Sequence, residues 1–198
     1  LYRGNDRNLT FFWKKHNTMD KIMLHNKRFR VCTTAAQIDE AVTVVAEKIN
    51  ADLKDVDTPI FLSVLNGSFM FTADLMRKIN INSDLAFIKL ASYSGTSSTG
   101  EVKQIMGLST DVKGRTVVIV EDIVETGNTI EEMYRILKEA GAAEIKICTL
   151  LLKPEAYKKN LKIDYAALCI PNDFIVGYGL DYNQLGRQYK DIYVLDEE

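Results

Sequence analysis

The chain has 198 residues, 46% of them hydrophobic and 26% charged, which is ordinary for one globular domain with a substantial core. Its formal net charge of −2 gives no electrostatic reason to expect a nucleic-acid partner or a membrane surface. No run approaches the roughly 20 apolar residues that a membrane span needs. We therefore expect neither nucleic acid nor a membrane among its partners.

The three cysteines, Cys32, Cys148 and Cys169, are widely spaced and form no Cys-x-x-Cys pair. An odd number in this arrangement argues against a disulfide framework and against a zinc site. Cys148 and Cys169 lie in apolar runs, so we expect buried thiols in a reducing compartment, which favours the cytoplasm.

Residues 1–18 lack the regular pattern that begins soon after Met19. Their only apolar cluster, Leu9 with Phe11–Trp13, is too short for the core of a signal peptide. We expect residues 1–18 to be an extension outside the fold and residues 19–198 to form a single domain.

Thr34 and Gln37 form a capping-box pattern before a run with apolar residues at helical spacing. The run after Pro59 is short and apolar, as in a buried strand. In chain order, the first half is predicted to contain a helix over 35–54, a strand over 59–65, a helix over 69–78 and strands over 85–90 and 101–108.

Residues 91–100 read Ala-Ser-Tyr-Ser-Gly-Thr-Ser-Ser-Thr-Gly and cannot form a core element. A polar stretch of this length is usually a working lid or a disordered linker. Because it lies between two strands of one domain, we favour a lid.

In the second half, a strand over 116–121 precedes a helix that begins at another capping-box pattern, Asn128 with Glu131. Gly141 is placed to end this helix. Strands are expected over 144–152, 165–170 and 191–195. This alternation predicts an α/β fold with a mostly parallel central sheet flanked by helices, whose ligands bind beyond the carboxyl ends of the strands.

The loop at residues 125–129 joins the predicted strand to the helix at that end of the sheet. Backbone N–H groups at a helix start lack partners within the helix, and the helix dipole favours an anion there. Gly127 allows a close backbone approach, while Thr126 and Thr129 add hydroxyl donors. Alone, this pattern fits a phosphate cradle and a ligand-free capped helix about equally well.

Glu121 and Asp122 shift the balance toward a ligand. Two carboxylates directly after a buried strand repel each other, unless the strand end is well solvated. Ribose hydroxyls and a divalent cation would satisfy both side chains. The segment therefore predicts a site for a phosphorylated sugar.

The motif resembles the signature of the type I phosphoribosyltransferases, and the chain resembles the hypoxanthine-guanine phosphoribosyltransferases from about Met19 to Glu198. Further matches are Leu65-Asn66-Gly67, the loop from Ser92-Tyr93 to Thr99-Gly100, Lys153, the run from Phe174 to Asn183, and Arg187. The resemblance implies the type I phosphoribosyltransferase fold, with a small hood and a flexible lid loop.

The resemblance also implies a role for each matching residue. The 5′-phosphate would be held by Glu125, Thr126, Gly127, Asn128 and Thr129, and the ribose and Mg²⁺ by Glu121 and Asp122. Diphosphate would be bound by Leu65, Asn66 and Gly67, where the family has a cis peptide, and by Arg187. The purine would meet Lys153, Phe174, Ile175 and Asp181, with Asp181 also a metal ligand and Ser92 and Tyr93 in the lid.

Lys153 closes an apolar strand and would donate a hydrogen bond to the 6-oxo group of the purine. Lysine only donates, and adenine carries an amino donor at that position, so a buried donor would stay unpaired. The substrates implied are 5-phosphoribosyl-1-diphosphate with hypoxanthine or guanine, giving IMP or GMP and diphosphate. The family further implies a homodimer or homotetramer.

Two positions depart from the family. Glu125 stands where most relatives have aspartate, and we expect it to remain the catalytic base that accepts the purine N7 proton. Asn66 stands where many relatives have a basic residue, which could weaken diphosphate binding or subunit coupling.

The alternatives are a phosphoribosyltransferase for adenine, orotate or xanthine, and a regulator that binds nucleotide and RNA through the same fold. Lys153, Phe174 and Asp181 argue against adenine and orotate. A dinucleotide-binding Rossmann domain is excluded because no G-x-G-x-x-G follows a strand. The preference between hypoxanthine and guanine, and the use of xanthine, stay open.

Overall fold

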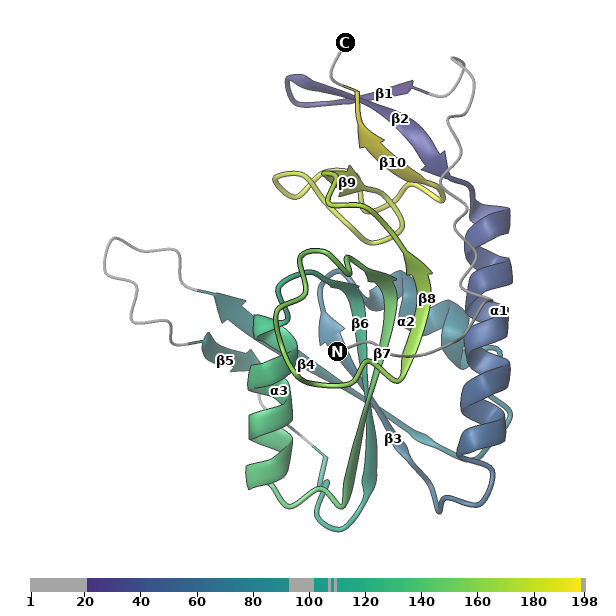
Figure 1. Ribbon diagram of the computed structural model, residues 1–198, viewed down its shortest axis with the longest axis vertical. Helices are drawn as coiled ribbons and strands as arrows, with labels where there is room; N and C mark the ends of the chain where they lie inside the picture. Colours follow the sequence, from purple (N-terminus) through teal and green to yellow (C-terminus); the bar gives the residue numbers. More distant parts are fainter. Residues whose placement is uncertain (1–20, 93–101, 107, 109, 197–198) are drawn as a thin grey trace.

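The computed structural model describes residues 21–92, 102–106, 108 and 110–196. A six-stranded sheet is flanked by helices, and a four-stranded sheet lies at the end toward which the parallel strands run (Figure 1). The extension expected at residues 1–18 and Tyr93 of the expected lid lie outside the described residues.

The six-stranded sheet has the order β5-β4-β3-β6-β7-β8. Its parallel strands are β4 (Asp84–Ser92), β3 (Ile60–Leu65), β6 (Thr116–Val124), β7 (Glu144–Leu152) and β8 (Tyr165–Cys169). The edge strand β5 (Val102–Met106) runs antiparallel to β4. This sheet confirms the predicted α/β class.

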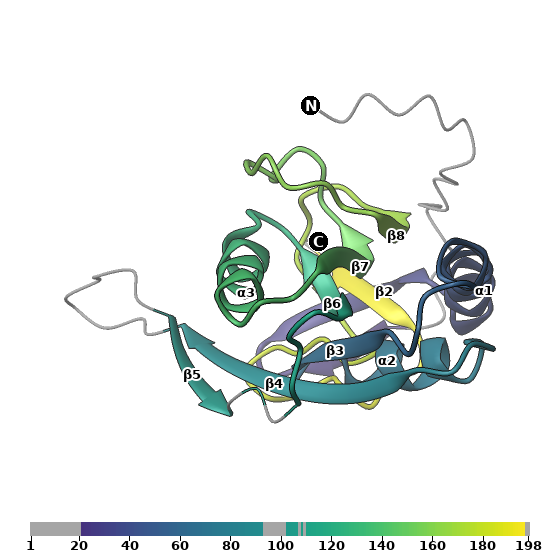
Figure 2. The same ribbon diagram turned by 90° about the horizontal axis from the view of Figure 1, so that it is seen from below.

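Helices cover both faces of this sheet (Figure 2). α1 (Ala35–Asp52) and α2 (Phe69–Met76) pack on one face, and α3 (Asn128–Glu139) packs on the other. The predicted capping box at the start of α1 is confirmed, because Thr34 and Gln37 each accept a hydrogen bond from the other's backbone N–H. Among the described helices, none is long and apolar enough to cross a membrane.

The aliphatic run of β6 fills the core on both sides of the sheet. Val118 and Val120 pack with α1 and α2, whereas Val117 and Ile119 pack with α3, and all four are fully buried. Side chains alternate between the faces of a strand, so a strand covered on both faces needs an unbroken apolar run. This requirement explains the sequence immediately before the acidic pair.

The second sheet contains strands from both ends of the described chain. Its antiparallel strands are β1 (Lys21–Leu24), β2 (Lys27–Thr33), β10 (Ile192–Leu195) and β9 (Ile175–Val176). The sequence predicted β10 but not β1, β2 or β9. This sheet forms the hood above the carboxyl end of the central sheet (Figure 1).

Two local predictions are wrong. β6 continues to Val124 rather than ending at Glu121, because Ile123 and Val124 still pair with β7. The acidic pair therefore lies within the strand. The capping box at Asn128 is absent: Gly127, with φ of 88°, caps α3, and no side chain caps this end.

The predicted end of α3 is confirmed. Gly141 has φ of 83°, its N–H donates to the Lys138 carbonyl, and the Ala142 N–H donates to the Leu137 carbonyl. This pair of hydrogen bonds is the Schellman arrangement that glycine favours.

Candidate active site at the carboxyl end of the sheet

Glu121 is buried and Asp122 is half-buried, a position that favours a ligand. Glu121 is 7% exposed, and its Oε2 atom has no hydrogen-bond partner among the described residues. Burial, with repulsion from Asp122, holds the pKa of Glu121 well above its usual range. A buried carboxylate oxygen without a partner is costly, and it is well suited to a hydroxyl donor or a cation.

Asp122 faces the loop after β3. Burial raises the pKa of Asp122 to about 6, although the Ile123 N–H donates to its carboxylate at 2.9 Å and Arg187 favours the ionised form. A Cβ added to Gly67 would overlap the Asp122 carboxylate. Only glycine at position 67 lets the loop come this close to the acid.

The loop after β3 has a cis peptide between Leu65 and Asn66, as the family resemblance implied. Asn66 is exposed, whereas Gly67 is buried. A Cβ added to Gly179 would overlap the Gly67 carbonyl oxygen, so the segment before Asp181 packs directly on this loop.

Three buried hydroxyl groups, those of Ser63, Ser68 and Thr72, form hydrogen bonds next to the loop after β3. The Ser63 Oγ atom lies 2.8 Å from both Ser68 Oγ and Thr72 Oγ1, and Ser68 donates to the Val64 carbonyl at 2.5 Å. Ser63, Ser68 and Thr72 are almost completely buried, so these hydrogen bonds fix the backbone that carries Gly67. The sequence analysis missed them, although a serine inside the apolar run of β3 was a usable signal.

Arg187 and Asp181 form an ion pair beside this loop. Arg187 Nη2 lies 2.5 Å from Asp181 Oδ1, and Nη1 donates to the Gly179 carbonyl at 2.7 Å. The Gln184 N–H donates to the other carboxylate oxygen of Asp181. The structure therefore gathers the expected diphosphate ligands, Gly67 and Arg187, around Asp122.

The predicted phosphate loop follows β6. Thr126 and Asn128 are exposed, Thr129 is half-buried, and Gly127 is buried with its positive φ. The cap residue of α3 is Gly127, which has no side chain to cap the helix, and backbone N–H groups at a helix start favour an anion.

Glu125 and Lys153 meet between the ends of β6 and β7. The Lys153 ammonium donates to Glu125 Oε1. The Lys153 side chain is only 6% exposed, whereas that of Glu125 is 50% exposed. The expected purine-recognition residue and the expected base are thus direct neighbours.

Phe174 lies in the hood, 44% exposed, in a T-shaped contact with Tyr182 at 5.6 Å between ring centroids. The Lys27 ammonium lies 5.8 Å from the Phe174 ring centroid and 5.6 Å from that of Tyr182. Ile175 is buried beside Phe174 in β9. The exposed part of the Phe174 ring is apolar surface on which a flat base can stack.

The lid is placed only in part. Ser92 ends β4 and pairs with Val102, while Tyr93 lies outside the described residues.

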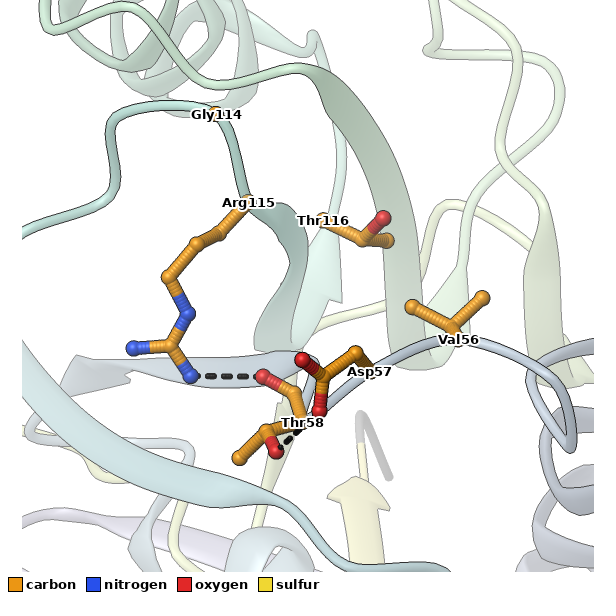
Figure 3. A pocket seen from close by; sticks show the side chains of 6 residues that line it. All are labelled: Val56, Asp57, Thr58, Gly114, Arg115 and Thr116. Carbon is orange, nitrogen blue, oxygen red and sulfur yellow. Dashed lines mark hydrogen bonds between the residues drawn. The ribbon is translucent and has the colours of Figure 1, made fainter.

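A hollow of about 520 Å³ lies at the opposite end of the sheet (Figure 3). It is lined by Val56, Asp57, Thr58, Gly114, Arg115 and Thr116. Arg115 already donates to the Thr58 carbonyl and to Asp84, both at 2.5 Å. Ligands of parallel α/β sheets bind at the other end, so this hollow is not the candidate site.

Known proteins have similar sequences and folds. The family model of the phosphoribosyl transferase domain matches residues 34–183. The chain belongs to the phosphoribosyltransferase family. The expected fold is thereby confirmed, and the match spans the acidic pair, the predicted phosphate loop and the residues expected to face the purine up to Asp181.

Among its relatives, this phosphoribosyltransferase is 38% identical to the hypoxanthine-guanine phosphoribosyltransferase of Streptococcus pneumoniae, over 89% of this chain and 98% of that protein. A solved hypoxanthine phosphoribosyltransferase (HPRT) in which an invariant aspartic acid is changed to glutamic acid is 37% identical. Its TM-score is 0.79 over 84% of this chain and 95% of that one. A solved Trypanosoma cruzi hypoxanthine phosphoribosyltransferase is 34% identical, with a TM-score of 0.80 over 88% and 95% of the two chains.

Proposed function

We propose that this phosphoribosyltransferase acts in purine salvage. It transfers the 5-phosphoribosyl group from 5-phosphoribosyl-1-diphosphate to hypoxanthine or guanine, giving IMP or GMP and diphosphate. Relatives named for these purines support the proposal. The observation that carries it is the contact between a buried lysine donor and a carboxylate acceptor, Lys153 with Glu125, beside the phosphate loop.

This pair of groups is complementary to one edge of a 6-oxopurine. The purine presents an acceptor, O6, next to N7, which carries a proton in one tautomer of the free base. Lys153 donates to O6 and Glu125 accepts from N7–H. The hydrogen bond between the two side chains is thus replaced by one hydrogen bond from each of them to the purine. Adenine presents an amino donor to Lys153 and is therefore disfavoured.

The sugar is held by the neighbouring groups. Backbone N–H groups of residues 125–129 bind the 5′-phosphate at the start of α3, and Glu121 and Asp122 accept hydrogen bonds from the ribose hydroxyls. Gly67 and Arg187 bind the diphosphate. These contacts fix the anomeric carbon in front of the purine.

Mg²⁺ is the cofactor of this proposal. Burial raises the pKa values of Glu121 and Asp122, so their ionised forms are costly unless a cation lies beside them, and one Glu121 oxygen has no partner among the described residues. Mg²⁺ is commonly held by one or two carboxylates together with substrate phosphates. Glu121 and Asp122 would meet Mg²⁺ at the ribose hydroxyls, and Asp181 would ligate Mg²⁺ at the diphosphate, where it would neutralise charge on the leaving group. The three carboxylates do not form one cluster among the described residues.

Bond formation follows from this arrangement. N9 of the purine attacks the anomeric carbon as the bond to diphosphate breaks, and the proton on N7 passes to Glu125. Phe174 stacks on the base, while backbone carbonyls near Ile175 and Asp181 receive the 2-amino group of guanine. The lid carrying Ser92 and Tyr93 excludes water from the sugar.

The proposal also includes a cytoplasmic location, a homodimer or homotetramer, and a single domain over residues 19–198. Size-exclusion chromatography with light scattering measures the assembly directly, and a monomer would contradict that part of the proposal.

A purine panel assayed with 5-phosphoribosyl-1-diphosphate and Mg²⁺ tests the function. We expect nucleotide and diphosphate from hypoxanthine and guanine, and little from adenine or orotate; the panel also measures the use of xanthine. Turnover of adenine comparable with that of guanine would refute the recognition scheme. Nucleotide binding without turnover of any base would support a regulator instead.

A further inference from the structure

The turn that follows β7 fastens the candidate phosphate loop through backbone hydrogen bonds. The Lys153 N–H donates to the Val124 carbonyl at 3.0 Å, and the Lys158 N–H donates to the Thr126 carbonyl at 3.4 Å. These two bonds flank Glu125 on either side. The phosphate loop is therefore tied to the segment that also carries the purine-facing lysine.

Side chains of the same turn cover Gly127. A Cβ added to Gly127 would lie 2.5 Å from Tyr157 Cε2 and 2.8 Å from Lys159 Cγ. The Tyr157 hydroxyl donates to the Leu161 carbonyl at 2.8 Å, which anchors the ring. The aliphatic part of Lys159 thus passes directly over the loop and directs its ammonium group toward α3.

The ammonium of Lys159 reaches the first turn of α3. Lys159 Nζ lies 2.7 Å from Glu131 Oε2, and the two side chains are 23% and 59% exposed. An acidic residue in the first helical turn interacts favourably with the helix dipole, but it repels an anion bound at the same end. Lys159 offsets that repulsion without occupying the loop itself.

We propose that Lys159 is a positioning residue that tunes the 5′-phosphate site by neutralising Glu131, while Tyr157 holds the turn against Gly127. The proposal rests on the proposed function, because it takes the loop at residues 125–129 as the phosphate site. Neither Lys159 nor Tyr157 belongs to the motif that identified the site. They contribute to the proposed phosphate site only because the turn after β7 contacts the start of α3.

Two single variants and the double variant, each removing charge from Lys159 or Glu131, test this inference. The affinity of the whole chain for IMP is measured by calorimetry. Lys159→Met leaves Glu131 unpaired near the phosphate, so IMP affinity should fall by about three- to tenfold. Glu131→Gln should bind IMP as well as the wild type or better. The double variant should return to within about twofold of the wild type, because neither charge remains.

The assay of turnover supplies a second readout. In Lys159→Met, KM for 5-phosphoribosyl-1-diphosphate should rise by a similar factor, while kcat stays nearly constant. Lys162→Met is the matched control, since Lys162 lies on the same connection, is 81% exposed and pairs with Asp164 instead. It should change neither quantity.

Two outcomes overturn the inference while leaving the proposed function intact. Unchanged IMP affinity in Lys159→Met would show that Glu131 does not influence the phosphate. Equal weakening in Lys159→Met and in the double variant would show that Lys159 binds the phosphate directly. A wild-type protein that binds no IMP would instead reject the proposed function.

Discussion

The ammonium of Lys153, directly after β7, pairs with the carboxylate of Glu125, directly after β6. A buried lysine needs a compensating charge, and Glu125 supplies it. Under the proposed function, a 6-oxopurine enters between these two groups and satisfies both. The same two side chains therefore balance each other before binding and recognise the base afterwards.

Lys153→Gln should relax the discrimination against adenine. Glutamine presents both a donor and an acceptor, so its amide can turn to meet the amino group of adenine. We expect the ratio of kcat/KM for guanine to that for adenine to fall by roughly tenfold or more. Lys153→Arg keeps a donor-only side chain and should preserve the preference. An unchanged ratio in the glutamine variant would remove Lys153 from the recognition scheme.

Glu125→Gln should lower turnover much more than substrate affinity. Glutamine keeps an acceptor for Lys153 but cannot take the N7 proton, and a general base contributes about 10²–10⁴-fold. We expect kcat to fall by about 10²-fold, with KM for 5-phosphoribosyl-1-diphosphate altered by less than about threefold. Glu125→Asp retains a carboxylate and should stay closer to the wild type. Full turnover in the glutamine variant would reject the assignment.

Asp122→Asn should stabilise the ligand-free protein at neutral and higher pH. The pKa of Asp122 is raised from 3.8 to about 6, so the folded state binds this proton more tightly than the unfolded state. Its favourable contribution is present below pH 4 and is lost as the pH rises through about 6. The free energy of unfolding at pH 8 should therefore be about 1–3 kcal/mol higher in the variant.

Urea unfolding at several pH values measures this difference, which should shrink toward pH 4. Asp55→Asn removes a charge from a side chain that is 88% exposed and serves as the control. A constant difference between pH 4 and pH 8 would mean that Asp122 does not titrate as proposed.

Gly179→Ala should be more damaging than Gly114→Ala. Both glycines have positive φ, 98° and 72°, so alanine at either position strains the backbone by about 1 kcal/mol. Only at Gly179 would the new Cβ also overlap the Gly67 carbonyl, whereas Gly114 faces open space. We expect an additional loss of about 1–3 kcal/mol in the free energy of unfolding.

The Gly179 variant should also raise KM for 5-phosphoribosyl-1-diphosphate, because the displaced loop carries Gly67. Urea unfolding and steady-state kinetics of the two variants provide the comparison. Equal losses at both positions, with unchanged KM, would show that the contact between Gly179 and Gly67 has no role in the site.

Local sequence patterns were sufficient for much of the central sheet. The apolar run of β7 predicted its bounds, Glu144–Leu152, and the Thr34 capping box predicted the start of α1. These features depend on side-chain periodicity and on hydrogen bonds between residues three apart. The acidic pair and the loop around Gly127 likewise form one continuous segment, so their order alone indicated a sugar-phosphate site.

Local patterns failed where distant segments compete for the same groups. Asn128 and Glu131 match a capping box, but Lys159 takes the Glu131 carboxylate, and Gly127 caps the helix. β6 extends beyond its predicted end because β7 provides backbone hydrogen-bond partners for residues after Glu121.

The sequence by itself determined the α/β class and the aliphatic core of β6, and it predicted the phosphate loop, because each depends on neighbours along the chain. Only the tertiary structure decided that Lys153 meets Glu125, that Gly179 packs on Gly67 next to Asp122, and that both chain ends share one hood sheet. Those contacts join residues far apart in sequence. Their geometry depends on how the sheets and turns pack, which no local spacing specifies.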